Sequence, residues 1–422
     1  MKLLVIGGGG REHAIIKKLK ENPQTEKIWC CPGNGGIAND AECVAISATD
    51  IEKQIAFAKE KEIDYVVVTP DDPLALGAVD AFTAAGFPCF GPEKKAAIIE
   101  ASKVFAKELM AKYAIPTAAY ASFDNVEEAE KYLDSQKMPI VIKADGLALG
   151  KGVIIAESLE EAKEAVREMM LENKFGSAGS RVVIEEFLTG PEVSVLCFTD
   201  GKTLVPMVSS MDHKRAHDND EGLNTGGMGA IAPNPCYTEA IAKEAYETIF
   251  MPTLKAMEAE GRTFKGCLYF SLMLTEDGPK VIEYNSRFGD PETQAVLPLL
   301  ESDLLTIFQA CTNGTLDQQE VVFKKDSSCC LVIASKGYPE HYEKGFPVEM
   351  SEEALKHCDF AGVKLQEGKL VSSGGRVLGI TCTAPTLKEA IAKSYELAKE
   401  VRFENGFCRG DIGQRALKAL EA

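Results

Sequence analysis

The sequence predicts a multidomain protein of the α/β and α+β classes, because the order of its strand and helix signals changes twice along 422 residues. Over the first hundred residues short apolar strands alternate with helices, which is typical of a doubly wound parallel sheet. Farther along, Asp200-Gly201 and Asp277-Gly278 each lie between two strand-like runs and predict antiparallel hairpins. A chain of this length exceeds one hydrophobic core, so we expect about two to four domains.

The N-terminal elements follow from alternating apolar and amphipathic segments. Buried strands are predicted at residues 3–6, 27–31 and 65–68. Helices are predicted at residues 11–20, 51–61 and 74–85. Ligands of such a sheet bind at the carboxyl ends of its strands, where the first strand here meets a run of glycines.

The central elements begin where Ser102 can cap a helix that extends to about residue 113. Ser158 and Glu161 form a capping box for a second helix, to about residue 173. Strands are predicted at residues 139–143, 153–155 and 181–187, and the two hairpins pair 192–198 with 202–207 and 267–274 with 280–284.

The C-terminal elements follow a helix near residues 304–311 and a polar stretch at 313–319 that predicts a boundary. Strands at 329–334 and 376–381 and a helix capped by Thr386 and Glu389 predict a small α+β domain. We therefore predict three domains, at residues 1–101, 102–320 and 321–422.

Composition excludes several classes of protein. Hydrophobic residues make up 45% of the chain, enough for buried cores, and the formal net charge of −18 disfavours nucleic-acid or anionic-membrane partners. The 13 cysteines show no C-x-x-C spacing and indicate reduced, mostly buried thiols. Residues 3–6 are too short for a signal-peptide core, and no apolar run could span a bilayer. We expect a cytoplasmic protein.

The segment GGGGREH at residues 7–13 follows a strand and opens a helix. It fails the dinucleotide fingerprint, because the third glycine position falls on Glu12 or His13, and a large side chain there spoils helix–sheet packing. The free amides of a helix N-terminus beside Arg11 indicate a phosphate-monoester site instead. An ordinary turn of glycines is the alternative. We expect His13, His213 and His217 to be structural or surface groups.

Two further glycine-rich segments suit small anionic ligands. Residues 143–152, KADGLALGKG, join two strands and place Lys143 and Lys151 on either side of a loop that can close over phosphates. It lacks the Walker A order, and a plain hairpin loop is the alternative. Residues 224–229, NTGGMG, follow DHKR at 212–215 and can bind a small substrate or simply hold their own loop together.

The segment VIEYNSRFGDPE at residues 281–292 carries the strongest chemical signal. Strand side chains repeat every second residue, so Glu283 and Asn285 project from one face, with Arg287 beyond them. Carboxylate and amide oxygens beside an arginine suit Mg²⁺ held against a polyphosphate, although a strand end running into a polar turn looks similar. No nucleophile motif accompanies them, so phosphoryl transfer by positioning and charge stabilisation fits best.

Taken together, these motifs resemble the phosphoribosylamine–glycine ligase (glycinamide ribonucleotide synthetase) family of the ATP-grasp superfamily. The resemblance covers essentially the whole chain and keeps the family's order. It is carried by GGREH at 9–13, PGN at 32–34, IKADGL at 142–147, GKG at 150–152, EEFL at 185–188, DHKR at 212–215, NTGGMG at 224–229, RFGDPE at 287–292, GGRV at 374–377 and FCRGDIG at 407–413.

The resemblance implies ATP-driven ligation of glycine to 5-phosphoribosylamine through a glycyl phosphate. It implies an N-terminal domain, a central ATP-grasp domain with a mobile lid at about residues 122–190, and the small C-terminal domain. The implied cofactors are ATP and Mg²⁺ or Mn²⁺, with no nucleic acid or membrane partner and a monomer or weak homo-oligomer.

The implied site residues fall into four groups. Metal ligands are Glu283 and Asn285. ATP contacts are Lys103, Lys143, Gly150, Lys151, Gly152, Glu185, Glu186, Phe187, Leu188 and Glu192. Glycine and phosphoribosylamine contacts are Gly9, Gly10, Arg11, Glu12, Asn34, Asp212, Asn224, Thr225, Gly226, Gly227 and Arg287. Catalytic groups are Arg287, Lys151 and Asp212.

Some positions depart from the family pattern. Leu149 stands where a small residue is usual, and Leu223 where proline is usual. The strand before Glu283 offers Tyr269-Phe270-Ser271 in place of a second metal carboxylate, which leaves the metal ligand set open. The alternatives are another purine-pathway ATP-grasp ligase or carboxylase, a nucleotide sensor without turnover and, as the weakest, an NAD-dependent dehydrogenase.

Overall fold

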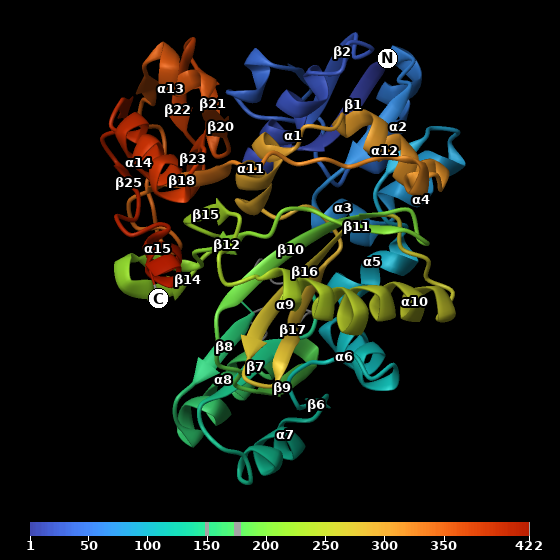
Figure 1. The fold of residues 1–422 in the computed structure, drawn as a ribbon, viewed down its shortest axis with the longest axis vertical. Coiled ribbons are helices and arrows are strands. Elements are labelled where there is room, and N and C mark those ends of the chain that lie inside the picture. Colours follow the sequence, from blue (N-terminus) through green and yellow to red (C-terminus); the bar gives the residue numbers. More distant parts are fainter. Residues whose placement is uncertain (148–151, 173–178, 422) are drawn as a thin grey trace.

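The computed structural model describes residues 1–147, 152–172 and 179–421. It confirms the predicted fold class, with a parallel N-terminal sheet followed by antiparallel sheets (Figure 1). The N-terminal domain and the β6–β9 sheet lie at opposite ends of the molecule, and the C-terminal strands lie to one side.

The N-terminal sheet is parallel throughout, with strand order β3-β2-β1-β4-β5. Its strands are β1 (Lys2–Gly7), β2 (Lys27–Pro32), β3 (Glu42–Cys43), β4 (Tyr65–Val68) and β5 (Cys89–Phe90). Its helices are α1 (Gly10–Lys20), α2 (Ile51–Lys61), α3 (Asp71–Leu76), α4 (Ala78–Ala84) and α5 (Lys94–Ala101). The single helix predicted at 74–85 is wrong: Gly77 has a φ of +94°, and this left-handed residue ends α3 before α4 begins.

Two antiparallel sheets of four strands form the central part. One has the order β6-β9-β7-β8 and the other β11-β10-β16-β17. Both predicted hairpins are present, β10 with β11 and β16 with β17. The strands are β6 (Tyr120–Phe123), β7 (Ile140–Ala144), β8 (Val153–Ala156), β9 (Val182–Glu186), β10 (Glu192–Thr199), β11 (Leu204–Pro206), β16 (Gly266–Thr275) and β17 (Gly278–Asn285).

The central helices keep their predicted caps. The side chain of Ser102 accepts from the amide of Phe105, and that of Ser158 from the amide of Glu161. The helix expected to reach about residue 173 ends at Met170. The helices are α6 (Lys103–Lys112), α7 (Val126–Leu133), α8 (Leu159–Met170), α9 (Glu239–Ala245) and α10 (Met251–Ala259), followed by α11 (Glu292–Val296) and α12 (Leu304–Asn313).

The C-terminal sheet has the order β12-β15-β18-β23-β20, with β25 also paired to β18. Its strands are β12 (Met211–Asp212), β15 (Gly229–Ala232), β18 (Ser327–Ser335), β20 (Cys358–Phe360), β23 (Arg376–Ala384) and β25 (Gly406–Phe407). The smaller ladders pair β13 (Arg215–His217) with β14 (Glu221–Asn224), β19 (Glu349–Met350) with β24 (Val401–Arg402), and β21 (Val363–Gln366) with β22 (Lys369–Ser372). The remaining helices are α13 (Glu352–Lys356), α14 (Leu387–Ala398) and α15 (Gln414–Glu421).

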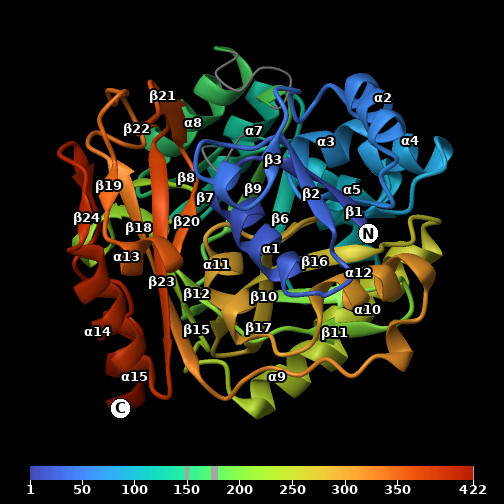
Figure 2. The same ribbon diagram turned by 90° about the horizontal axis from the view of Figure 1, so that it is seen from above.

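A shared hydrophobic core fixes these parts against one another. Leu3 and Phe90 of the parallel sheet belong to the same buried cluster as Phe198, Phe288 and Phe308. The rings of Phe90 and Phe308 stack with centroids 3.8 Å apart. Seen from above (Figure 2), the C-terminal sheet lies beside the N-terminal domain, where β20 packs against α1. No helix in the described ranges is both long and apolar enough to cross a bilayer.

Candidate active site

A cavity of about 930 Å³ runs between the two central sheets and reaches the N-terminal and C-terminal domains. It brings together most of the residues predicted from the sequence: Arg11, Lys103, Lys143, Gly152, Glu185, Glu186, Phe187, Leu188, Glu192, Asp212, Asn224, Thr225, Gly226, Glu283, Asn285 and Arg287. The predicted residues that do not line it are Gly9, Gly10, Glu12, Asn34 and Gly227. Gly150 and Lys151 lie outside the described residues.

One end of the cavity holds a buried carboxylate between two lysines. Glu185 Oε2 on β9 lies 3.1 Å from Lys143 Nζ on β7 and 3.0 Å from Lys107 Nζ on α6. The other oxygen of Glu185 is buried and has no hydrogen-bond partner among the described residues. Burial lowers the pKa of Lys107 to about 8. No sequence motif identified Lys107, although it lies one helical turn after Lys103 and so on the same face.

Lys103 is fixed at the first turn of α6. Its Nζ donates to the carbonyl of Gly146 at 2.8 Å, and burial lowers its pKa. Asp145 tethers the same turn, because its Oδ1 accepts from Ser102 Oγ at 3.0 Å and from the amide of Val104 at 3.1 Å. Asp145 and Gly146, which directly follow β7, are therefore held against the start of α6.

Glu283 and Asn285 both line the cavity from β17, as their spacing predicted. Burial by itself raises the pKa of Glu283, but the net shift is downward because of four nearby cations, Lys214, Lys143, Lys103 and Arg287. The carboxylate is therefore ionised and faces concentrated positive charge. Across the ladder Tyr269 pairs with Asn285, and Ser271 with Glu283, so β16 adds no carboxylate here. Tyr269 instead donates to Glu292 Oε1 at 2.6 Å.

Arg287 is held by a carboxylate that the sequence analysis did not identify. Its Nη2 lies 3.0 Å from Glu100 Oε1 and donates to Asn285 Oδ1 at 3.2 Å, while Nη1 donates to the carbonyl of Phe288. The second oxygen of Glu100 accepts from the amide and hydroxyl of Ser286, at 2.9 and 2.8 Å. Burial raises the pKa of Glu100, and although burial lowers that of Arg287, the carboxylate of Glu100 raises it overall.

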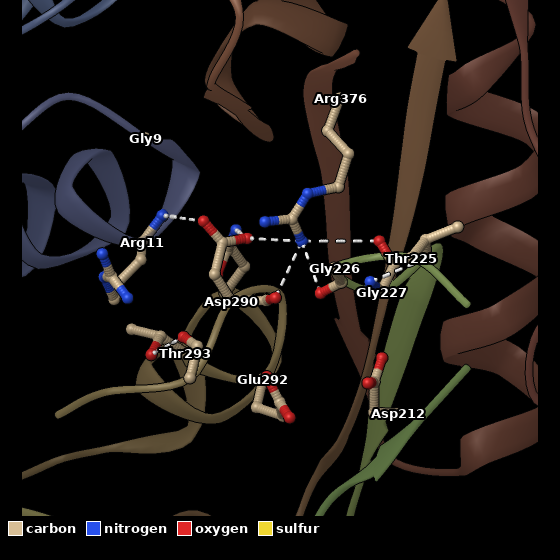
Figure 3. Close-up of polar contacts among 12 residues, drawn as sticks. Gly9, Arg11, Asp212, Thr225, Gly226, Gly227, Asp290, Glu292, Thr293 and Arg376 are labelled. Carbon is tan, nitrogen blue, oxygen red and sulfur yellow. Dashed lines mark hydrogen bonds and ion pairs between the residues drawn. The ribbon is translucent and has the colours of Figure 1, made fainter. Parts of the chain in front are cut away.

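Asp212 and the loop that follows β14 form the next wall of the cavity (Figure 3). Burial, and then the nearby carboxylate of Glu292, raises the pKa of Asp212 well above its usual value. Gly227 has a φ of +114°, and a Cβ there would lie 2.7 Å from Asp212 Oδ1 and 2.4 Å from Pro291 Cδ. The close approach of backbone to carboxylate therefore requires glycine at this position.

The predicted anion site at the start of α1 is occupied by the protein's own carboxylates. The amide of Gly9 donates to Glu12 Oε2 at 2.7 Å, and the amide of Arg11 to Asp290 Oδ2 at 3.3 Å. Glu12 is buried and also accepts from Thr69 Oγ1 at 2.7 Å. Glu12 therefore has a structural role: from the third residue of α1 its side chain caps the amide of the N-cap residue Gly9.

The side chain of Asn34 is likewise fully used in hydrogen bonds within the protein. Its Nδ2 donates to the carbonyls of Gly8 and Phe360, each at 2.9 Å. Its Oδ1 accepts from the amides of Gly36 and Ile37. Both ends of the side-chain amide are therefore used in joining β1, the loop after β2, and β20.

Comparison with known proteins identifies the fold and the family. Three family models match in order along the chain: the Phosphoribosylglycinamide synthetase N domain at residues 1–100, its ATP-grasp (A) domain at 101–293 and its C domain at 328–415. The chain is similar to a crystal structure of phosphoribosylamine–glycine ligase from Thermotoga maritima, with a TM-score of 0.85 and 35% identity over 98% of this chain and 100% of that one. The crystal structure of a biotin carboxylase–β,γ-ATP complex from Campylobacter jejuni, 14% identical with a TM-score of 0.74 over 96% of this chain and 92% of that one, shares the fold.

Curated relatives agree over nearly their whole length. The chain is 48% identical to phosphoribosylamine–glycine ligase from Caldanaerobacter subterraneus over 98% of this chain and 99% of that protein. It is 50% identical to the ligase of the same name from Listeria innocua over 99% and 100%. With all three family models matched and relatives this similar from end to end, the chain belongs to the phosphoribosylglycinamide synthetase family.

Proposed function

We propose that this chain ligates glycine to 5-phosphoribosylamine at the expense of ATP, giving glycinamide ribonucleotide, ADP and phosphate. The observation that carries the proposal is one continuous cavity. It joins the lysines beside β7 and β9, the Glu283–Asn285 face of β17 and the acidic wall around Asp212. The names of the relatives, which match this chain along its length, support the same reaction.

The reaction proceeds in two displacements. A carboxylate oxygen of glycine attacks the γ-phosphorus of ATP, ADP leaves with the bonding electrons, and glycyl phosphate forms. The amine of phosphoribosylamine then attacks the acyl carbon, loses a proton and expels phosphate. The ion pair with Glu100 holds Arg287 beside the face of β17 that carries Glu283 and Asn285. From there the charge of Arg287 stabilises both the transferring phosphoryl group and the acyl phosphate.

Glu283 and Asn285 fit a Mg²⁺ or Mn²⁺ ion, because an ionised carboxylate and an amide oxygen face the cavity from one strand. Such an ion neutralises charge on the triphosphate during phosphoryl transfer. Within the described residues no group of three or more His, Cys, Asp or Glu side chains could hold a metal. We propose that ATP oxygens and water would complete the coordination of the ion.

The remaining contacts of the proposal are those that the family resemblance implies. Lys103, Lys143, Lys151 and the glycines at 150 and 152 bind the phosphates, adenine lies against residues 185–188, and Glu192 binds the ribose. Glycine lies between Asp212 and residues 224–227, where its ammonium group stabilises the carboxylate form of Asp212. Residues 122–190, which include β7, β8 and β9, act as the lid that excludes water from the acyl phosphate.

A direct assay tests this function. The purified chain is supplied with Mg²⁺, ATP, glycine and phosphoribosylamine generated in the same vessel, and ADP, phosphate and the amide product are measured. With glycine labelled by ¹⁸O in its carboxylate, one label should appear in phosphate, as the acyl phosphate requires. ATP binding without phosphate release would indicate a sensor. Turnover with bicarbonate or formate and another ribonucleotide, but not with glycine, would indicate a different ligase.

We also propose the cellular compartment and the oligomeric state of the enzyme. The 13 cysteines are all free, which supports a reducing compartment such as the cytoplasm. We propose a monomer or weak homo-oligomer, and light scattering on the eluting protein measures this directly.

A further inference from the structure

The structure argues against the start of α1 as the binding site of the substrate phosphate. The sequence indicated the start of α1, but two of its amides already donate to carboxylates, one of Glu12 and one of Asp290. A phosphate there would displace these hydrogen bonds and approach two anions. Of the five residues around α1 predicted to hold phosphoribosylamine (Gly9, Gly10, Arg11, Glu12 and Asn34), only Arg11 lines the cavity.

Arg376, in the GGRV segment at the start of β23, offers an alternative, and no role was predicted for it from the sequence (Figure 3). Its Nη1 is fully engaged, donating to the carbonyls of Asp290 at 2.7 Å and Gly226 at 2.8 Å and lying 3.2 Å from Asp290 Oδ1. Among the described residues none accepts a hydrogen bond from its Nε or Nη2. The side chain is 22% exposed and lines the cavity. One edge of the guanidinium is anchored, and the Nε–Nη2 edge has no acceptor among the described residues, although the side chain lines the cavity.

The backbone of Gly226 packs closely against the guanidinium of Arg376. A Cβ at Gly226 would lie 2.9 Å from Cζ, 3.0 Å from Nη2 and 3.2 Å from Nε of Arg376, so the guanidinium lies directly against this glycine. The amide of Gly226 donates to the hydroxyl of Tyr338, which also lines the cavity. The orientation of the free Nε–Nη2 edge is therefore fixed before any ligand binds, as tight oxyanion recognition favours.

A second arginine lies near Arg376, with the carboxylate of Asp290 between the two. Figure 3 shows the unbonded Nη2 pointing toward helix α1, from which Arg11 reaches the cavity. The Nη1 of Arg11 donates to the carbonyl of Phe288 at 3.1 Å, so both arginines are anchored on residues 288–290. In Figure 1 the strand that carries Arg376 lies away from β7 and β9, where the adenine end is proposed.

We infer that the free Nε–Nη2 edge of Arg376 binds the phosphate monoester of phosphoribosylamine, with Arg11 adding charge from the opposite domain. This inference rests on the proposed ligase function and deepens it. A planar guanidinium offers two parallel N–H groups that match two phosphate oxygens, which an ammonium group cannot reproduce. Arg376 thereby draws the C-terminal domain into substrate recognition.

Ribose 5-phosphate tests the inference without turnover, because it keeps the phosphate and lacks the reacting amine. Its affinity is measured by calorimetry in saturating Mg²⁺ and ADP, which fill the nucleotide end, with ribose as the phosphate-free control. Arg376→Met should weaken ribose 5-phosphate by about 10- to 100-fold, and Arg376→Lys by about tenfold, while ADP affinity stays within about twofold. Arg402→Met removes the same charge from an exposed position on β24 and should change neither affinity.

Steady-state kinetics separate this inference from the proposed function. Arg376→Lys should raise the KM for phosphoribosylamine and leave those for ATP and glycine unchanged. A rise in the glycine KM instead would show that Arg376 binds the glycine carboxylate, and unchanged ribose 5-phosphate affinity in both variants would also overturn the inference. If Arg376→Met fails to fold, Arg376→Lys decides. Absence of product with the wild-type chain would refute the proposed function, whatever the ribose 5-phosphate result.

Discussion

Single side chains on β17 determine whether the cavity can hold a divalent ion. Glu283→Gln keeps the size of the side chain and removes the charge that faces Lys214, Lys143 and Lys103. Removing a residue that only supports a metal ligand typically lowers activity by about 10- to 100-fold. Because Glu283 is itself the proposed ligand, we expect turnover to fall by more than this, with the melting temperature nearly unchanged. Glu276→Gln in the exposed turn of the same hairpin is the matched control. Full activity at ordinary Mg²⁺ concentrations would contradict the metal assignment.

Glu100 tests whether Arg287 must be held in place to act. Glu100→Gln removes the ion pair with Arg287 but can keep one hydrogen bond to Ser286. We expect kcat to fall by about 10- to 100-fold with the KM for ATP within about threefold, because Arg287 acts on the transition state. Glu100→Asp should recover part of the loss. Glu93→Gln, exposed at the start of the same helix, serves as control. A rise in KM with unchanged kcat would be evidence for a binding role instead.

Local spacing predicted some of these residues and not others. Glu283 and Asn285 could be paired from the two-residue repeat of a strand, and Lys143 from its place beside a glycine loop. Glu100 and Arg376 could not, because their partners lie 187 and 86 residues away in the chain. Such contacts depend on how domains pack, which no local pattern specifies.

At the scale of elements, His213 joins the loop after β12 to the C-terminal segment. Its Nδ1 donates to the carbonyl of Gly229 at 3.2 Å, and its Nε2 accepts from the amide of Gly413 at 3.1 Å. A proton on Nε2 would face the N–H of Gly413, so these contacts require the neutral ring. Burial accordingly lowers the pKa of His213 from 6.5 to about 4.

This shift predicts acid sensitivity. Between pH 6.5 and about 4 the unfolded chain binds a proton at this histidine and the folded chain does not, so the free energy of unfolding falls as pH decreases. The loss at pH 4 should reach about 3 kcal/mol from this group. Urea unfolding across this range should show a shallower pH slope for His213→Gln than for the wild type, and no change for His341→Gln, which is exposed. Equal slopes in all three proteins would contradict the explanation.

Helices and strands were predicted correctly where the residues that determine them are close together in the sequence. Asp200-Gly201 and Asp277-Gly278 predicted the two hairpins, since turn and register are local. The pairing of β15 with β18 was not predicted, because these strands are about a hundred residues apart. That pairing carries β12 and β15 into the C-terminal sheet across the predicted boundary at residue 320, so the domain limits stay a prediction.

At the scale of the whole molecule, Asp290 is the residue at which the three parts meet. Its Oδ2 accepts from the amide of Arg11 on α1, and its Oδ1 lies 3.2 Å from Arg376 Nη1 on β23 and accepts from Gln294 at 2.8 Å. Although burial raises the pKa of Asp290, the two arginines lower it overall, so it is ionised at neutral pH. Its charge thus links α1 of the N-terminal domain to β23 of the C-terminal domain.

Asp290→Asn should therefore weaken the contact between the N-terminal and C-terminal domains and with it the stability of the whole protein. We expect the free energy of unfolding to fall by about 1–3 kcal/mol, because Arg376 and the start of α1 both lose a charged acceptor. The KM for phosphoribosylamine should rise while Mg²⁺–ADP binding, which depends on the central sheets, stays unchanged. Denaturant unfolding and calorimetry measure the two effects, with Asp277→Asn in an exposed turn as control. Weakened ADP binding together with weakened substrate binding would mean that Asp290 supports the cavity as a whole, against a specific link between the outer domains.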